Sequence, residues 1–263
     1  MRRFEDKVVI VTGASTNPGI GGSCARRLGS EGASLVINAR SPEALAAAEQ
    51  ELRDDGVEVI SIVGSMNDDA TSGRLVEAAL ERFGRLDGLV NTVGGAPHHA
   101  RIADLSRDQL LDTMNLNLWP AVALVQAAVA RGFRDGAVVN VSSGSPNKTT
   151  PKMASYAAAK AALNTLTRTM AADLRLAGIR VNAVSPGLTR TEATRGLWEK
   201  DGGAWAAEHS PLGRMTEADD IAAAAAFLLS ADARSITGVV IDVDGGDHLM
   251  SGGWSPFAGS DGS

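Results

Sequence analysis

Cysteine and tyrosine are almost absent from this sequence, which contains one of each, Cys24 and Tyr156, among 263 residues. A single cysteine cannot form an intrachain disulfide, and this favours a reducing compartment such as the cytoplasm. Cys24 lies in an expected helix, where a small buried side chain is a more ordinary role than a reactive thiol. The lone tyrosine raises another question, because a chain that needed only bulk could use phenylalanine.

Long apolar runs are also missing. The longest run, "IAAAAAFLL" at residues 221–229, is far shorter than a membrane span. The first residues, "MRRFEDKVVIVTG", lack the apolar core of a signal peptide. We therefore expect a soluble, cytoplasmic protein with no membrane partner.

There is no excess of basic residues, since 25 Lys and Arg stand against 31 Asp and Glu for a net charge of -6. This balance argues against a nucleic-acid backbone as a partner. The four histidines, His98, His99, His209 and His248, have no metal-ligand spacing, so we predict no metal site. We expect His98 and His99 on a surface loop; the border of a substrate pocket is the alternative.

Seven short runs rich in valine and isoleucine are continuously apolar, which is typical of strands buried on both faces. They are residues 7–12, 33–39, 57–63, 86–91, 136–142, 179–185 and 238–243. Alanine-rich segments with helical spacing lie between them, for example residues 41–55 and 69–84. This alternation predicts an α/β fold with a parallel, doubly wound sheet. Without a visible linker, we predict one domain over residues 1–250 and a Gly/Ser-rich tail at 251–263.

The first predicted strand ends in a glycine-rich turn, "TGASTNPGIGGS", which contains Gly13, Gly19 and Gly21 and leads into an expected helix. Such a turn predicts a dinucleotide-binding site, because glycines let the backbone approach a pyrophosphate whose charge favours the helix N-terminus. We expect Asn17 to cap that helix, with Pro18 at its first position. A purely structural turn is the alternative.

Tyr156 stands four residues before Lys160 in "SYAAAK", within a segment of helix formers at residues 154–178. Side chains at i and i+4 project from one face of a helix. A free phenol titrates near pH ~10, and a nearby ammonium group favours the phenolate, so we expect Lys160 to lower the pKa of Tyr156. The pair then predicts a proton donor or acceptor. The alternative is a packed tyrosine beside a solvated lysine.

The order of these motifs resembles the short-chain dehydrogenase/reductase family over nearly the whole chain, from "VTGAS" to "VDGG". The resemblance implies a single-domain Rossmann fold with a seven-stranded parallel sheet, and an oxidoreductase that uses a nicotinamide cofactor. The family has three residues between its first two glycines, whereas this chain has five, residues 14–18. The two-residue insertion leaves the phosphate cradle recognisable.

The resemblance implies a catalytic set of Asn117, Ser143, Tyr156 and Lys160. Asn117 best matches the family's active-site asparagine in "NLNLWP", and Asn115 is the alternative. Ser143 precedes Tyr156 by thirteen residues, the separation usual in the family. Ser142 is one residue out of register, so we expect it to be structural.

The roles of these side chains follow partly from chemistry and partly from the resemblance. Tyr156 protonates the developing alkoxide during reduction, or accepts the alcohol proton during oxidation. The Ser143 hydroxyl hydrogen-bonds the same substrate oxygen and stabilises its charge. By resemblance, Lys160 also holds the nicotinamide ribose, and Asn117 holds a water that links this lysine to solvent.

The expected cofactor-binding residues come from the glycine turn, the ends of the following strands and "NAVSPGLTRT", which resembles the segment that holds the nicotinamide. They are Gly13, Ser15, Thr16, Asn17, Gly19, Ile20, Gly21, Arg40, Ser65, Met66, Asn91, Gly94, Tyr156, Lys160, Pro186, Gly187, Leu188, Thr189 and Thr191. The family's usual acidic residue after the third strand is missing. Ser65 is the nearest match, so we expect a different adenine contact.

The end of the second predicted strand indicates the choice of cofactor. Proteins that bind NAD usually carry an acidic residue about 20 positions beyond the glycine turn. Ala39 takes that position here, and Arg40 follows it. A guanidinium can hold a phosphate with paired hydrogen bonds, so we predict a preference for NADP(H), with NAD(H) as the runner-up. A solvated arginine at the strand end is the competing interpretation.

Residues 191–210 match the family's variable substrate-binding segment. Trp198 and Trp205 are seven residues apart and share one face if this stretch is a single helix. We favour a role in covering an apolar substrate. The alternative is that they pin the segment to the core.

Together these observations predict an NADP(H)-dependent enzyme that reduces a ketone or oxoacyl carbonyl to the alcohol, reversibly. An NAD-dependent alcohol dehydrogenase with the same site is one alternative. A cofactor-binding regulatory protein without turnover is another, but it would not need the serine, tyrosine and lysine together. The resemblance also implies a homotetramer in which the alanine-rich helices near Asn117 and Ser155, apolar on more than one face, pack against a partner.

Overall fold

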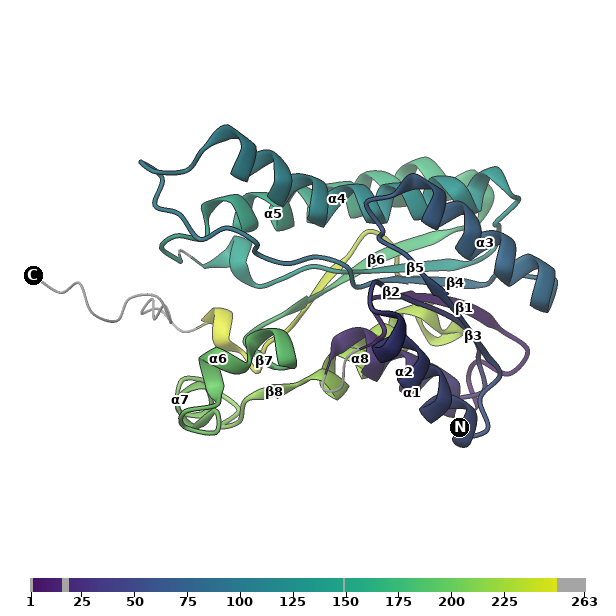
Figure 1. The fold of residues 1–263 in the computed structure, drawn as a ribbon, viewed down its shortest axis with the longest axis horizontal. Coiled ribbons are helices and arrows are strands. Elements are labelled where there is room, and N and C mark those ends of the chain that lie inside the picture. The colour runs from purple at the N-terminus through teal and green to yellow at the C-terminus, as the bar shows by residue number, and fades with distance from the viewer. Residues whose placement is uncertain (1, 16–18, 149, 250–263) are drawn as a thin grey trace, which may run out of the picture.

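The computed structural model describes residues 2–15, 19–148 and 150–249 and is built on one parallel sheet (Figure 1). In this part of the chain the sheet has seven strands in the order β3-β2-β1-β4-β5-β6-β9. The strands are β1 (Val8–Thr12), β2 (Ser34–Ala39), β3 (Val59–Val63), β4 (Gly88–Asn91), β5 (Ala137–Val141), β6 (Arg180–Pro186) and β9 (Val240–Val243). Each lies within one of the seven apolar runs except β6, which extends one residue beyond its run, so the predicted strands and the doubly wound sheet are confirmed. The predicted tail at 251–263 lies outside the described residues.

Helices cover both faces of the sheet (Figure 1). One core joins the sheet to α1 (Ile20–Ser30), α2 (Pro42–Asp54) and α8 (Ala218–Leu229). The other joins it to α3 (Asp69–Phe83), α4 (Arg107–Ala130) and α5 (Ala154–Asp173). Short 3-10 helices are η1 (Ser145–Asn147), η2 (Leu174–Ala177), η3 (Glu192–Thr194), η4 (Ala231–Ala233) and η5 (Asp247–Leu249). Two cores on two faces explain why the strands are apolar along their whole length.

Side-chain caps fix where several helices begin. Ser41 and Asp68 accept hydrogen bonds from the first turns of α2 and α3, and Ser106 forms a capping box with Gln109 at the start of α4. The start of α1 differs, because Gly19 is its N-cap and offers no side chain. The prediction that Asn17 caps this helix is therefore wrong, and Asn17 itself lies outside the described residues.

The order of the strands reverses beside β1, since β2 lies on one side of it and β4 on the other. Ligands of doubly wound sheets bind beyond the carboxyl ends of the strands at such a point. The glycine turn follows β1, the loop with Ser143 follows β5, and Pro186 ends β6. The topology therefore brings these segments to one edge of the sheet.

The variable segment is not one helix. It contains α6 (Arg195–Trp198) and α7 (Ala204–Glu208), and Gly202 and Gly203 between them have φ of +66° and +86°. The prediction that Trp198 and Trp205 share a helical face is wrong, because these left-handed residues interrupt the helix. A small ladder of β7 (Thr189–Arg190) with β8 (Thr216–Glu217) joins the two ends of the segment.

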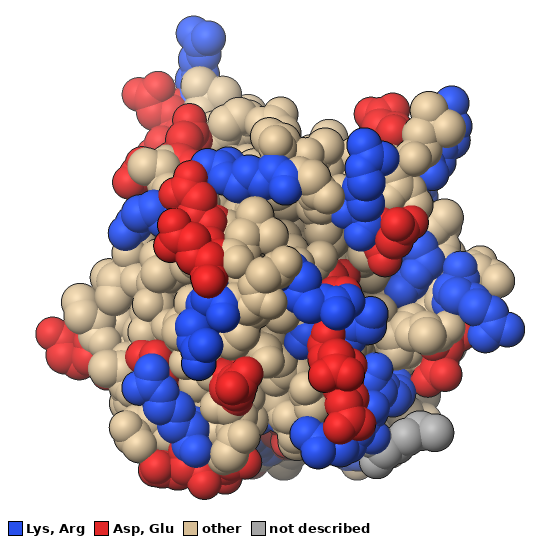
Figure 2. Space-filling view, turned by 90° about the vertical axis from the view of Figure 1, so that its right-hand side faces the viewer, with Lys and Arg blue, Asp and Glu red and all other residues tan. Residues whose placement is uncertain are grey.

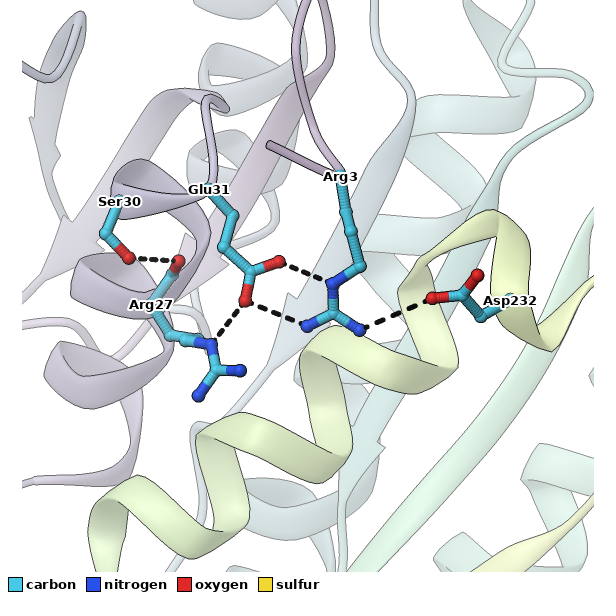
Figure 3. Close-up of a pocket in the computed structure, with 5 residues that line it drawn as sticks. All are labelled: Arg3, Arg27, Ser30, Glu31 and Asp232. Atoms are coloured by element: carbon cyan, nitrogen blue, oxygen red, sulfur yellow. Dashed lines mark hydrogen bonds and ion pairs between the residues drawn. The ribbon is translucent and has the colours of Figure 1, made fainter. Parts of the chain in front are cut away.

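The opposite edge of the sheet carries an ion-paired hollow (Figure 3). Figure 3 shows Glu31 between Arg3 and Arg27, while Arg3 also reaches Asp232. The hydrogen bond from Arg3 is the main cause that lowers the pKa of the nearly buried Glu31 carboxyl. These pairs join the start of the chain to the end of α1 and to η4. Because the hollow lies at the end away from the glycine turn, we assign it to stability.

Figure 2 shows one side of the molecule, where basic and acidic side chains are interspersed. At the amino ends of β1 and β4, Asp87 pairs with Lys7 and Arg85. Across residues 2–15, 19–148 and 150–249, no helix combines the length and apolar character needed to cross a membrane. The same residues contain no cluster of three or more His, Cys, Asp and Glu side chains suited to a metal ion.

Candidate active site

The glycine turn after β1 brings two stretches of backbone into close approach. Gly13 has φ of +66°, and a Cβ on Gly21 would lie 2.2 Å from the Gly13 carbonyl oxygen. Neither position can accept a side chain without a shift of the backbone. Gly19 is buried in front of the first turn of α1, where Ile20 begins the helix. Ser15 is half-buried beside the turn, and the predicted contacts Thr16 and Asn17 lie outside the described residues.

Two threonines that the sequence did not single out tie this turn to the loop after β4. The Thr92 amide donates to the Thr12 hydroxyl at 3.1 Å, and the Thr92 hydroxyl donates to the Thr12 carbonyl. Thr12 in turn donates to the Val90 carbonyl at 3.3 Å. These hydrogen bonds connect the glycine turn to the "NTVGG" loop. The signal for this contact in the sequence is that Thr12 ends the first predicted strand and Thr92 directly follows the fourth.

Asn91, at the end of β4, is buried and donates its Nδ2 to Asn140 Oδ1 at 2.9 Å. Its own Oδ1 is buried without a hydrogen-bond partner among the described residues. An unpaired buried acceptor is costly unless a further donor completes it. This places an unused acceptor on the strand that borders the glycine turn.

Lys160, Asn117 and Gly94 meet at the centre of the site. The Lys160 Nζ is buried and donates to the Val141 carbonyl at 2.9 Å. A Cβ on Gly94 would lie 2.9 Å from that Nζ and 2.7 Å from Asn117 Oδ1. Glycine is thus required at this position, because a side chain would displace the buried ammonium group.

Asn117 is held by backbone groups on two sides. Its Nδ2 donates to the Gly95 and Thr113 carbonyls, each at 2.8 Å, and its Oδ1 accepts from the Gly95 amide at 3.0 Å. Asn117 is 1% exposed, whereas Asn115 is exposed on the outer side of α4. Of the two candidates, Asn117 is the one beside Lys160.

The Ser143 side chain interacts with the Tyr156 phenol and acts to lower its pKa. Ser145, which the sequence analysis did not single out, orients Ser143: its amide donates to Ser143 Oγ at 3.1 Å, and the two hydroxyls lie 2.9 Å apart. Ser142 points elsewhere, donating to Asn164 Oδ1 at 2.5 Å. Ser142 is therefore structural, and the Ser143 hydroxyl is the one that faces the tyrosine.

The electrostatics differ from the expectation for Tyr156. Burial raises the pKa of Tyr156, and the interaction with the Ser143 side chain only partly opposes this. The pKa of Tyr156 is therefore raised overall, whereas the sequence predicted that the Lys160 ammonium, 5.8 Å from the phenol ring centroid, would bring it below its ordinary value. Burial also lowers the pKa of Lys160, to about 8. Desolvation dominates at both groups because it disfavours each charged form.

The strand end at Pro186 borders the same loop as Ser143. The Gly144 amide donates to the Pro186 carbonyl at 2.8 Å. Gly187 packs closely on Asp244, since a Cβ there would lie 2.6 Å from the Asp244 Cβ. Beyond it, Leu188 is half-buried, and Thr189 and Thr191 are buried with hydroxyls bonded to Gly187 O and Thr194 Oγ1 respectively.

The expected adenosine contacts lie farther along the edge, at the ends of β2 and β3. Ala39 is buried and Arg40 is exposed, with no hydrogen bond or ion pair to any residue that the structure describes. Ser65 is exposed, whereas the Met66 side chain is buried in the core beneath it. Only the backbone of Met66 can therefore face a ligand.

These residues fit a dinucleotide with a nicotinamide. The glycine turn leaves room for a pyrophosphate at the start of α1, and a substituent at Gly94 would fill space beside Lys160. Asn91 adds an unused acceptor at the same edge. The catalytic candidates Asn117, Ser143, Tyr156 and Lys160 are brought together, while Arg40, Ser65 and Met66 lie at the outer strands.

The lowered pKa of Lys160 makes stability depend on pH. An ordinary lysine pKa is 10.5, so between about pH 8 and that value the unfolded chain holds a proton that the folded protein has released. The free energy of unfolding therefore rises with pH in this window. Relative to Lys160→Met, which cannot titrate, we expect the wild type to gain about 1 kcal/mol between roughly pH 7 and roughly pH 9.

Denaturant unfolding of both proteins at the two pH values measures this gain, and other titrating groups cancel in the difference. A difference that stays constant, or that moves against the wild type, would show that the ammonium group is not desolvated.

Known proteins are similar to this chain in sequence and in structure. A family model described as enoyl-(acyl carrier protein) reductase matches residues 13–248. The A-factor type gamma-butyrolactone 1'-reductase (1S-forming) of Streptomyces virginiae is 35% identical over 251 residues, which cover 93% of this chain and 96% of that protein. The L-rhamnose 1-dehydrogenase (NAD(P)(+)) of Azotobacter vinelandii is 38% identical over 249 residues, 92% and 96% of the two chains.

A solved structure is similar over the same span. The short chain dehydrogenase from Burkholderia cenocepacia J2315 in complex with NADP has a TM-score of 0.84 and 32% identity, covering 93% of this chain and 99% of that one. The resemblance stated from the motifs is confirmed. The chain belongs to the short-chain dehydrogenase/reductase family of oxidoreductases, which bind nicotinamide cofactors.

Proposed function

We propose that this protein is an NADP(H)-dependent oxidoreductase that reduces a ketone or oxoacyl carbonyl to the alcohol, reversibly, with Tyr156 as proton donor or acceptor. The observation that carries the proposal is that Tyr156 lies beside both the Ser143 side chain, which acts on its pKa, and the buried ammonium of Lys160, 5.8 Å from the phenol ring centroid. A packing tyrosine would need neither partner. All three groups lie at the edge of the sheet that carries the glycine turn.

The bound nicotinamide supplies the hydride for reduction, or accepts it during oxidation. The residues proposed to hold the cofactor are those of the glycine turn and the segment Pro186 to Thr191, with Lys160 on the ribose. The rest of the chemistry is proton transfer and charge stabilisation, which the side chains of this chain perform.

The protonation state of Tyr156 suits the reduction direction. Because burial raises its pKa, the phenol stays protonated at neutral pH and can donate its proton to the carbonyl oxygen as this oxygen gains charge. Ser143 donates a hydrogen bond to the same oxygen, while the Ser145 amide donates to Ser143 Oγ and orients it. Lys160 then stabilises the phenolate while the lysine is charged, below about pH 8.

Two features favour a small carbonyl or alcohol substrate with apolar parts. The two named relatives are a reductase and a sugar dehydrogenase, so their names share this reaction type and differ in substrate. Leu197 in the variable segment is 37% exposed, and Leu212, just beyond the segment, is 68% exposed. Trp198 packs under Arg190, 4.7 Å from ring centroid to guanidinium, and donates to the Thr191 carbonyl, so it anchors the segment.

Tyr156→Phe removes one hydroxyl and keeps the ring. We expect kcat for carbonyl reduction to fall by at least about 1,000-fold while the cofactor Kd and the unfolding midpoint stay near those of the wild type, because the lost group acts in proton transfer. Stopped-flow cofactor oxidation with a panel of ketones measures kcat, and fluorescence titration measures the cofactor Kd. Ser143→Ala should lower kcat by about 100- to 1,000-fold on the same substrate.

A Tyr156→Phe enzyme that retained most of its turnover would exclude the phenol as the proton donor. Cofactor binding by the wild type with no turnover of any ketone, oxoacyl thioester or alcohol tested would instead favour a regulatory protein.

The preference for NADP(H) rests on the end of β2. Ala39 offers no carboxylate to hydrogen-bond a ribose hydroxyl or to repel a 2′-phosphate. Arg40 follows it with an exposed guanidinium that has no partner among the described residues, so its donors are available to a phosphate. Ser41 is not equally available, because its hydroxyl caps α2 and donates to Glu43.

We expect Ala39→Asp with Arg40→Ala to move the ratio of kcat/KM for NADPH over NADH by at least about 100-fold toward NADH, since a negative charge is added and a positive charge is removed. Arg53→Ala, an ion-paired arginine at the far end of α2, is the matched control and should leave the ratio unchanged. A wild type that already turns over NADH more efficiently than NADPH would refute the role of Arg40 and favour the NAD-dependent alternative.

We also propose that the protein assembles as a homotetramer through α4 and α5. Leu111, Trp119 and Val129 on α4 are 48%, 38% and 37% exposed although the other side of the helix packs on the core. Apolar residues on two sides of one helix need a second partner surface. Light scattering at micromolar protein should give four times the chain mass; a monomeric mass would overturn the proposal.

A further inference from the structure

The orientation of the Ser143 hydroxyl depends on a short helix that follows it. Ser145, the first residue of η1, donates its amide to Ser143 Oγ at 3.1 Å. Within η1, Asn147 N donates to the Gly144 carbonyl at 2.9 Å and Lys148 N to the Ser145 carbonyl at 3.3 Å. These hydrogen bonds close a single 3-10 turn that connects Ser143 to Lys148.

That far end is tied to another part of the chain. The Lys148 side chain forms an ion pair with Asp247 of η5, and the two side chains are 31% and 28% exposed. Lys148 comes from the loop after β5, whereas Asp247 follows β9, the last strand of the sheet. The pair is the charged contact that joins these two loops.

The segment around Asp247 is itself ordered by a buried carboxylate. Asp244, 6% exposed, accepts from Gly246 N at 2.9 Å with one oxygen, and from His248 N at 2.9 Å and His248 Nδ1 at 2.7 Å with the other. The Asp247 amide donates to the Asp244 carbonyl at 3.2 Å. Asp244 also abuts Gly187, so this turn has a fixed position against the end of β6.

We propose that Lys148 is a positioning residue for Ser143, acting through η1 because its ion pair with Asp247 anchors the far end of that helix to the turn after β9. The inference rests on the proposed function, in which Ser143 hydrogen-bonds the substrate oxygen. A serine that stabilises developing charge must keep its oxygen within a few tenths of an ångström of its place. The sheet fixes the start of this loop at β5, and Lys148 fixes its other end.

A merely stabilising role predicts a different result. Partly exposed ion pairs contribute little to the free energy of unfolding, and the turn around Asp244 has its own hydrogen bonds. Loss of the pair should therefore leave the unfolding midpoint nearly unchanged and lower the rate of the chemical step. A fall in kcat with an unchanged unfolding midpoint indicates a positioning role, whereas a lowered midpoint indicates a merely stabilising role.

The first arm of the test compares Lys148→Met with Lys7→Met, which breaks an ion pair to Asp87 at the opposite edge of the sheet. We expect Lys148→Met to lower kcat by about five- to ten-fold with little change in KM, in cofactor Kd or in the unfolding midpoint. Lys148→Arg, which keeps the charge, should restore most of the lost activity. Lys7→Met should leave kcat unchanged.

The second arm repeats Lys148→Met in a Ser143→Ala background. If Lys148 acts through Ser143, the substitution has no further effect on kcat there, whereas an independent role would multiply the two losses. A full loss in the alanine background, an unchanged kcat in Lys148→Met alone, or a lowered unfolding midpoint that accounts for the loss would each overturn the inference. If Ser143→Ala alone left kcat unchanged, the proposed function itself would fail.

Discussion

Lys160 keeps an ammonium group buried at the carboxyl end of β5, and much of the site is arranged around it. Burial alone lowers the pKa of Lys160 to about 8, so the charge is retained at neutral pH but is poorly solvated. The Val141 carbonyl accepts one of its hydrogens, and Gly94 leaves the space that a side chain would take. A poorly solvated cation interacts strongly with an anion formed nearby. In the proposed mechanism this anion is the phenolate that Tyr156 becomes when it donates its proton.

The glycine turn imposes a second, steric constraint that fixes how the cofactor edge is built. Gly21, in the first turn of α1, lies so close to the Gly13 carbonyl that no side chain fits between them. Thr12 and Thr92 then fasten this turn to the loop that carries Gly94. The start of α1 and the space beside Lys160 therefore belong to one connected group of contacts, and in the proposed function this group joins the cofactor turn to the lysine.

The sheet could be predicted from the sequence, since strands buried on both faces appear as apolar runs. The closeness of Tyr156 to Lys160 could also be predicted, since they are one helical turn apart. Other features depend on tertiary contacts. The direction of the Tyr156 pKa shift follows from burial, which no spacing reveals. Ser145 matters because η1 folds back on Ser143, and the two tryptophans of the variable segment are separated by glycines with positive φ. The roles of Arg40 and of the other cofactor contacts remain predictions.

The variable segment, residues 191–210, is attached to the rest of the protein by its own set of contacts. Residues 191–210 are clamped at their base, because β7 pairs with β8 and Arg190 bonds both Glu217 and the Gly202 carbonyl. Ser210 adds a contact at 3.2 Å to the Gly245 carbonyl in the turn after β9. In the proposed function this segment borders the substrate and is held by contacts that include neither Pro186 nor Ser143. The turn after β9 differs, since it contacts both this segment, through Ser210, and the residues after β5, through the ion pair of Asp247 with Lys148.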